Sequence, residues 1–250
     1  MHTTIAWAEA NTPDDTFQKL TGVADQHVKR SEEKFYLFDY NHLIGAAAFP
    51  GALALEARLV SPSLRRINPF YITPIEAALV PTEPLAMIYH PMSPIRLDVN
   101  ESLEAELKAT AGVAREASIV AFLSPGASPP VNGEIFTINC EVYVELILHK
   151  WQYAEITFPD SLPVGNYRVV GVRAVIADGV AFRLVPVGEA YRPGGLCAQA
   201  VNENDPPLQR FGGLGNWCSF STIQPPGMEV LCSTAAGVDT YQVYIDAIKA

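Results

Sequence analysis

The chain is 250 residues long, 49% hydrophobic and only 18% charged, with a formal net charge of −10. This composition excludes a disordered chain and is sufficient for a full hydrophobic core, in one large β-sandwich or two small domains. Residues 1–125 carry 10 Lys and Arg against 15 Asp and Glu, and residues 126–250 carry 7 against 12, so each half has a net charge of −5. The densest basic cluster is the pair Arg65-Arg66. A nucleic-acid site needs several clustered cations, so we expect no direct contact with DNA or RNA.

Two further classes of segment are not expected. No apolar run approaches the ~20 residues of a membrane-spanning helix, so the sequence predicts no transmembrane segment. The first four residues, Met1-His2-Thr3-Thr4, lack the charged and apolar regions of a signal peptide. The low charge predicts instead that some apolar surface is buried against other subunits, because obligate interfaces resemble a core cut in half.

The first half of the chain predicts short strands, proline-rich turns and two helices. Residues 12–22 predict a helix with Thr12 as N-cap and Pro13 at the first helical position. Eight of the 20 prolines fall in residues 50–94, which excludes a long helix there. Residues 34–40, 55–60, 85–90 and 118–123 predict strands.

The second predicted helix covers residues 101–111. Asn100 is a suitable N-cap, and Leu103, Leu107 and Ala111 would share one face. The run of turn residues from Ser124 to Gly133 follows the next strand. It either separates a domain of residues 1–125 from a β-sandwich core of residues 126–250, or is a long loop inside one continuous domain of residues 1–250.

After Gly133 the sequence predicts strands throughout. Apolar residues recur at every second position from Phe136 to Leu148, which indicates a half-buried sheet face. The dipeptide Asp178-Gly179 between two apolar runs predicts a hairpin of two central strands, residues 166–176 and 180–187. Further strands are expected at residues 153–158, 196–201, 217–222, 228–233 and 241–248. Strands at this spacing are typical of a sandwich or barrel.

Residues with metal-binding or nucleophilic chemistry lack the spacing of known sites. The five histidines have no second ligand at a metal-binding spacing, and His149 is expected on the exposed side of its strand. The glycine-rich run Gly212–Gly215 lacks the lysine and following helix of a phosphate loop, so a flexible loop or a close backbone contact is expected. The four cysteines are expected as buried, reduced thiols: Cys140, Cys197, Cys218 and Cys232.

Carboxylates and aromatic residues also favour structural roles. Asp98, Glu101 and Glu104 lie at the start of the second predicted helix, where capping explains them. The aromatic residues of the second half are expected in the core or in subunit contacts more than in a carbohydrate site: Tyr167, Phe182, Tyr191, Trp217, Phe220, Tyr241 and Tyr244. The sequence therefore predicts no catalytic, cofactor-binding or metal-binding residue.

One stretch of the second half resembles a known family. It runs from Gly165-Asn-Tyr-Arg-Val-Val-Gly-Val-Arg-Ala through Phe182-Arg-Leu-Val-Pro-Val-Gly to Tyr-Arg-Pro-Gly194. Together with the many short strands and proline-rich connections, it is similar to viral jelly-roll capsid proteins. The resemblance implies a jelly-roll-like antiparallel β-sandwich with two short helices in its connections; the alternative is two small tandem β-sandwiches.

The leading functional hypothesis is a self-assembling structural protein, a major capsid subunit of a bacterial or archaeal virus, and not an enzyme. It would be made in the host cytoplasm and reside in the virion, with identical subunits and other virion proteins as partners. The missing basic arm is compatible with a shell that lies against an internal membrane. The alternatives are a carbohydrate- or receptor-binding sandwich of a fibre or spike, and a hydrolase on a β scaffold with two carboxylates in one cleft.

Overall fold

A computed structural model of the chain describes residues 1–9, 15–50, 54–67, 70–72, 86–109, 117–198, 209–232 and 237–250. Antiparallel strands dominate these residues, which confirms the prediction of a mainly β protein. The chain divides into two compact units, and the change between them falls after Ala127. We call Ile5–Ala127 the N-terminal unit, and Met1–Thr4 with Ser128–Ala250 the C-terminal unit. None of the described helices is long and apolar enough to cross a membrane.

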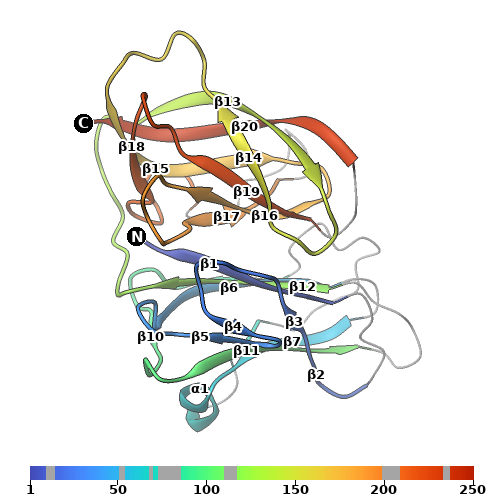
Figure 1. Cartoon of the computed structure of the whole chain (residues 1–250). Coiled ribbons are helices and arrows are strands. Elements are labelled where there is room, and N and C mark those ends of the chain that lie inside the picture. The colour runs from blue at the N-terminus through green and yellow to red at the C-terminus, as the bar shows by residue number, and fades with distance from the viewer. Residues whose placement is uncertain are drawn as a thin grey trace. The chain divides into compact units, whose positions relative to one another are not determined.

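The C-terminal unit has the strand order of a jelly roll. Numbered one to eight along the chain, its strands form the rows 1-8-3-6 (β13-β20-β15-β18) and 2-7-4-5 (β14-β19-β16-β17), which are two interlocked Greek keys (Figure 1). A short pairing of β13 with β14, at Val142 and Ile156, joins the two rows into one curled sheet. The strands are β13 (Phe136–Leu146), β14 (Gln152–Thr157), β15 (Asn166–Val175), β16 (Gly179–Val185), β17 (Gly194–Leu196), β18 (Cys218–Ser221), β19 (Gly227–Cys232) and β20 (Gly237–Lys249).

The same order recurs in the N-terminal unit. One sheet places β12 between β1 and β6, with β9 and β10 along the far edge of β6, and the other places β11 between β7 and both β5 and β2. The rows 1-8-3-6 and 2-7-4-5 result when β2 and β5 together count as strand two and β9 and β10 as strand six. The short strands β3 and β4 are additional edge strands, on β1 and β5. The strands are β1 (Thr3–Glu9), β2 (Gln18–Lys19), β3 (Thr21–Gly22), β4 (Arg30–Ser31), β5 (Lys34–Tyr36), β6 (His42–Pro50), β7 (Ala54–Val60), β8 (Phe70–Tyr71), β9 (Ala86–Tyr89), β10 (Ile95–Arg96), β11 (Ser102–Ala109) and β12 (Ala117–Ser124), and a helix, α1 (Pro62–Ile67), lies between β7 and β8.

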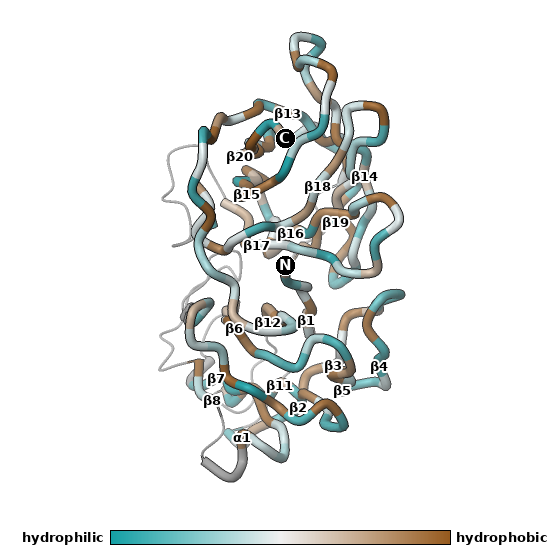
Figure 2. Tube along the Cα trace, turned by 90° about the vertical axis from the view of Figure 1, so that its left-hand side faces the viewer, coloured by the Kyte–Doolittle hydropathy of each residue, from teal (hydrophilic) through white to brown (hydrophobic). Residues whose placement is uncertain are grey.

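The burial of side chains explains why these segments are strands. Along β13 every second residue from Ile138 to Leu146 is buried, and the residues between them are exposed. In β15 four consecutive residues, Val169 to Val172, are buried, which confirms that this strand is central. Hydrophobic segments recur along the strands of both units (Figure 2). Most of the other predicted strands are also confirmed, and β5, β7, β9, β12, β14, β18, β19 and β20 overlap them; β17 ends at Leu196, and residues 199–201 lie outside the described part.

Both predicted helices are wrong where the structure describes them. Residues 102–109 form strand β11, which pairs with β7 from Glu104 to Ala109. The apolar positions that fit a helix also fit a strand, because Ala105 lies between Leu103 and Leu107 and all three are buried. Of the predicted helix 12–22, residues 18–19 and 21–22 are the strands β2 and β3, and residues 12–14 lie outside the described part.

The helix that the structure does contain begins inside the proline-rich region. Ser61 is its N-cap, with the hydroxyl accepting the Leu64 N–H at 3.2 Å, and Pro62 occupies the first helical position. Glu101 completes the cap, because its carboxylate accepts the backbone N–H and the hydroxyl of Ser63 at 3.0 and 2.6 Å. Glu101 therefore caps a helix, as its charge indicates, but a different helix from the predicted one.

The predicted hairpin at Asp178-Gly179 is a turn between strands that do not pair. Asp178 has a φ of 65°, as such a turn requires. However, β15 pairs with β20 and β18, whereas β16 pairs with β19 and β17, so the turn carries the chain from one row of the jelly roll to the other. Local turn chemistry specifies the reversal of the chain, but hydrogen bonds to distant strands determine the partners.

Candidate functional site

His2 and His149, the two histidines of the C-terminal unit, lie in different environments. His2 is fully buried in the C-terminal unit, where its Nε2 lies 2.9 Å from the Gly194 carbonyl and its ring meets the edge of Trp217. Burial lowers the pKa of His2 to about 4, so this ring is neutral at pH 7. His149 was expected on an exposed strand face, but it lies half-buried in a turn after β13, with a φ of 55°. Among the described residues, no group of three His, Cys, Asp or Glu is placed to hold a metal ion.

The cysteines and the glycine-rich run have structural surroundings. All four cysteines are buried, as predicted, and burial raises the pKa of Cys140 and of Cys218 to about 12, which disfavours the reactive thiolate. The Gly212–Gly215 run packs closely on the backbone of residues 128–131, with Val131 N–H donating to the Gly212 carbonyl at 3.0 Å. The close backbone contact expected for these glycines is confirmed.

The sequence places Asp98, Glu101 and Glu104 at the start of a predicted helix, but in the structure they have separate roles. Glu104 on β11 lies between two cations, with Lys19 Nζ at 2.9 Å and Lys34 Nζ at 3.2 Å. Asp98 accepts the Asn100 N–H at 3.1 Å and lines a small groove beside Arg96. It is the one carboxylate among the described lining residues of that groove, whereas the hydrolase hypothesis requires two.

A buried carboxylate in the C-terminal unit holds the loop before β18 against the sheet. Asp246 on β20 is fully buried and accepts two hydrogen bonds from Arg210, at 2.6 and 2.8 Å. It also accepts the Phe211 N–H at 3.0 Å and the Thr137 hydroxyl at 2.7 Å. Burial by itself would raise the pKa of Asp246, but these four donors outweigh it and lower the pKa. The carboxylate is therefore charged, and its hydrogen-bonding capacity is filled by these donors. Its role is structural, because it holds Arg210 and Phe211 of this loop against strand β20.

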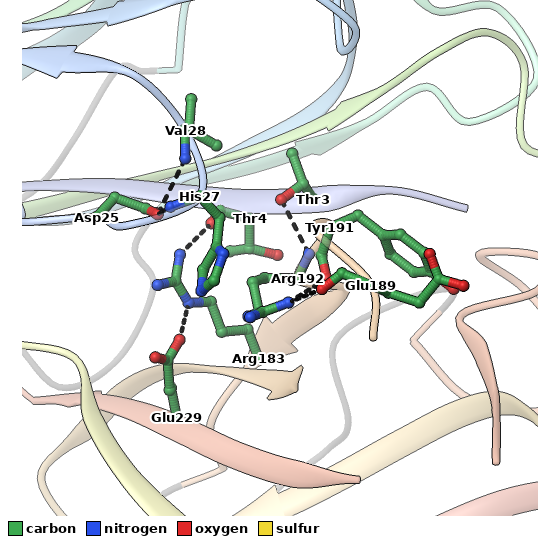
Figure 3. A network of polar contacts seen from close by, with 10 residues as sticks. All are labelled: Thr3, Thr4, Asp25, His27, Val28, Arg183, Glu189, Tyr191, Arg192 and Glu229. Carbon is green, nitrogen blue, oxygen red and sulfur yellow. Dashed lines mark hydrogen bonds and ion pairs between the residues drawn. The ribbon is translucent and has the colours of Figure 1, made fainter. Parts of the chain in front are cut away.

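A second ion pair, between a buried arginine and a half-buried glutamate, lies on the other row of strands. Arg183 on β16 donates to Glu229 at 2.5 Å and to the Thr4 carbonyl at 3.1 Å (Figure 3). Its guanidinium also lies 4.3 Å from the centre of the Trp151 ring. Nearby, the Arg192 N–H donates to the Thr3 hydroxyl at 3.1 Å, and the guanidinium of Arg192 donates to the Glu189 carbonyl at 2.6 Å. Thr3 and Thr4 are the first residues of β1 but belong to the C-terminal unit, so both arginines have structural partners within their own unit.

The aromatic residues separate into a buried set and an exposed set. Six of the seven aromatic residues that were expected in the core or in contacts are buried, and Tyr244 is half-buried. Sequence reasoning missed the exposed set, because alternation along a strand does not say which outward residues remain uncovered. Tyr143 on β13 and Tyr153 on β14 are 68% and 57% exposed.

The most distinctive surface is an apolar end of the C-terminal unit. It combines the connection from β14 to β15 with the connection from β18 to β19. We call the following residues the apolar end: Phe158, Pro159, Leu162, Val164, Phe220, Ile223 and Pro225. Within this set, Phe220 is buried, with its ring stacked on Tyr167 at 5.5 Å and packed against Phe158 at 5.2 Å.

Hydrogen bonds between Gly165 and Thr222 hold the two connections together. Gly165 N–H donates to the Thr222 hydroxyl at 3.2 Å, and Thr222 N–H donates to the Gly165 carbonyl at 3.0 Å. The Tyr167 hydroxyl donates to the Pro163 carbonyl at 2.6 Å, and the two prolines of the first connection restrict its backbone. The apolar end is therefore a preformed surface, not a pair of independent loops.

Two adjoining grooves are open at this surface. One has a volume of about 350 Å³, and Val164 and Ile223 on its rim are 80% and 81% exposed. The second has a volume of about 380 Å³, continues past Phe136 to Asn139 and shares Pro159 and Leu162 with the first. No ionisable residue is among the described residues that line either groove. Asp160, between the lining residues Pro159 and Ser161, is exposed on the same connection. The linings themselves are apolar and can bury area against a partner.

Comparisons with known proteins assign no family to the chain. No family model matches it, and no curated protein matches it significantly. Among solved structures, a Paenibacillus xanthan lyase aligns over 97% of this chain with 11% identity and a TM-score of 0.22. The chain spans 26% of the length of that lyase chain. A likeness at this TM-score carries no argument about fold or activity.

Proposed function

We propose that the chain is a structural subunit that assembles with copies of itself into a closed shell, as the major capsid subunits of bacterial or archaeal viruses do. The observation that carries the proposal is the jelly-roll strand order in both units. Jelly rolls of this order recur in viral capsid domains, and also in lectins and cupins. Two in succession give one chain two sandwiches with which to make contacts.

The role under this proposal is geometric. Identical subunits bury matching surfaces against one another, and closed symmetry sets the size of the shell. The preformed apolar end supports this role, because exposed apolar patches mark interaction sites. The partners would be identical subunits and other virion proteins, and the protein would reside in the virion.

Negative-stain imaging and mass photometry of the purified protein test the proposal. We expect shells or closed oligomers whose mass is a multiple of the 27.2 kDa subunit. A chain that stays monomeric at a concentration of about 1 mM, where a millimolar Kd would still show, would contradict the proposal.

A second candidate is a carbohydrate-binding module. It is favoured by Tyr143 and Tyr153, whose exposed rings lie on the outward side of neighbouring strands. Exposed aromatic rings provide the apolar platform that sugar rings need. A glycan array tests this candidate: hits that disappear in Tyr143→Ala and Tyr153→Ala would support it, and an array without hits would reject it.

A further inference from the structure

We infer that strand β13 binds an extended, basic segment of another protein, which adds to the free edge of β13 as a further strand. The inference goes beyond the proposed function, because it concerns a different partner chain and a strand edge, not the contacts between identical subunits. It is carried by three observations: backbone groups without a strand partner, a groove beside them, and carboxylates around that groove.

One edge of β13 lacks a neighbouring strand along its first residues. On one side, β13 pairs with β20 over all of its 11 residues, from Phe136 to Leu146. On the other side, β14 pairs with it only at Glu141 and Val142. Of the described strands, none pairs with Phe136–Cys140 on that side. The N–H and C=O groups that point there are a template for an added strand, because an extended peptide can satisfy them as a neighbouring strand does.

The groove of about 380 Å³ lies beside this free edge. Its walls are Phe136–Asn139 of β13 and, on the connection that follows β14, Pro159, Leu162 and Pro163. The edge from Phe136 to Cys140 measures about 16 Å, which is enough for a segment of ordinary strand length. Alternate side chains of that segment can point into the groove, where Leu162 offers an apolar contact. The two prolines restrict the backbone of this wall, so little conformational freedom is lost on binding.

The charges around the groove select a basic segment. Residues 133–146, which contain β13, and residues 152–164, which contain β14 and its connection, together carry five carboxylates and no lysine or arginine. All five are exposed: Glu134, Glu141, Glu145, Glu155 and Asp160. The guanidinium of Arg210 reaches the Thr137 hydroxyl at 3.5 Å, but it is already paired with Asp246. Lysine or arginine side chains are therefore attracted here, whereas a second copy of this chain, with a net charge of −10, is repelled.

The test measures the fluorescence anisotropy of labelled synthetic peptides mixed with the full chain at low salt. The probe is a peptide of Lys-Val repeats, whose alternation gives one basic and one apolar face when it is extended. We expect this peptide to bind, and we expect NaCl to weaken the binding, because screening reduces the attraction. A peptide of Glu-Val repeats should bind at least ~10-fold more weakly. A Lys-Val peptide that is methylated on every backbone nitrogen keeps its charge but cannot donate main-chain hydrogen bonds, and it should also lose at least ~10-fold.

Substitutions in the protein locate the site. Asp160 lies between the lining residues Pro159 and Ser161, so Asp160→Lys should weaken binding of the Lys-Val peptide about 10-fold. Glu189→Lys makes the same change of charge at another exposed position of the C-terminal unit, after β16, and should change the binding less than about 2-fold. Circular dichroism melts establish that both variants are folded. Equal effects of the two variants would place the peptide elsewhere and overturn the inference.

Amide hydrogen exchange, detected by NMR, reports on the strand edge itself. In the free protein we expect the amides of Phe136–Cys140 to alternate between slow exchange, where they face β20, and fast exchange, where they face the free edge. The Lys-Val peptide should slow the fast set. Slow exchange of every one of these amides in the free protein would show that the edge is not free, which also overturns the inference.

The peptide assays have further outcomes that contradict strand addition. If the Lys-Val peptide does not bind at about 1 mM, where a Kd of this size would still show, the site does not exist. Equal binding of the methylated peptide would reduce the contact to charge attraction, and equal binding of the Glu-Val peptide would remove the selection by charge. Assembly into shells is a separate measurement. A chain that forms shells without binding the peptide keeps the proposed function and loses this site, and a monomer that binds the peptide does the reverse.

Discussion

In the N-terminal unit, charged side chains lie on the outward side of the sheet that contains β11, where Glu104 pairs with Lys19 and Lys34, and Glu106 with Arg58. The cations of these pairs remain partly exposed to solvent. The carboxylates of these pairs are buried, since Glu104 and Glu106 are 8% and 7% exposed. In the C-terminal unit burial goes further, with Asp246 fully covered and Arg183 nearly so. The two units thus reach the same strand order with different chemistry.

The difference teaches which property of a sequence specifies this fold. The strand order does not require a particular kind of ion pair, since the pairs of the N-terminal unit include partly exposed cations and those of the C-terminal unit are more deeply buried. What the units share is a set of strands with an apolar inward face, and the pairing of the first strand with the last and the second with the seventh. We expect removal of a charge to have a larger effect in the C-terminal unit, because burial raises the cost of an unpaired ion.

The largest expected effect comes from Asp246→Asn. It removes the charge that holds Arg210 and weakens the hydrogen bonds from Phe211 and Thr137. Breaking one partner of a buried ion pair costs about 3–5 kcal/mol of the free energy of unfolding. Urea denaturation measures the loss, and amide hydrogen exchange localises it to β13–β20. Asp239→Asn, on the exposed part of the same strand, should change stability by less than about 0.5 kcal/mol. Equal effects of the two variants would refute the proposed role of Asp246 in holding the loop against the sheet.

The next effect depends on pH. The pKa of His2 falls from 6.5 to about 4 on folding, so the folded protein binds fewer protons than the unfolded chain between these values. Stability is therefore fully present above pH 6.5 and is lost as the pH falls towards 4, by up to about 3 kcal/mol. His2→Gln should flatten this slope in denaturation curves of the C-terminal unit. His90→Gln, at an exposed position, serves as the control, and an unchanged slope in His2→Gln would disprove the assignment.

Steric fit gives a third effect. Gly212 has a φ of +84°, and an added Cβ would overlap the Val131 carbonyl oxygen. Gly188 has a φ of +78° but open space around it. We expect Gly212→Ala to cost about 2–3 kcal/mol and Gly188→Ala about 1 kcal/mol, because only the first adds a clash to the backbone strain. Thermal melts of both variants measure the difference, which should vanish if residues 128–131 do not pack on this run.

The smallest expected effect tests the N-terminal unit. Glu104→Gln removes two ion pairs with partly exposed lysines, and such pairs contribute about 0.2–1 kcal/mol each. We expect a loss of about 1 kcal/mol, which raising the salt concentration reduces, and a double-mutant cycle with Lys34→Met isolates one pair. A loss as large as that of Asp246→Asn would show that the two units do not differ in the way described.

Several features of the fold could be predicted from the sequence, and particular residues show why others could not. The alternation in β13 predicts both the strand and its buried face, because a period of two fits no helix. The segment 101–111 was predicted as a helix because Leu103 and Leu107 fit both periods, and the choice depends on hydrogen bonds from β11 to β7. A jelly-roll-like sandwich was expected through a resemblance, with two small tandem β-sandwiches as the alternative, whereas the strand order of each unit has no counterpart in a repeated sequence.

The candidate site, too, has features that the sequence predicts and features that it does not. Aromatic residues of the core were predicted as such, but no local pattern indicates that Phe158 and Phe220 meet, or that Val164 and Ile223 stay uncovered. The apolar end forms only because two connections 60 residues apart are brought together by strands β14, β15, β18 and β19.

The sequence by itself determined the class of the protein: a mainly β chain with buried cysteines and turns at glycine and proline. These properties follow from side-chain period, size and backbone preference, which act over a few residues. The tertiary structure alone decided that residues 102–109 are a strand, that β15 and β16 belong to different rows, and that the apolar end faces solvent. Those outcomes depend on hydrogen bonds and burial between residues far apart in the chain, whose free energies no local window contains.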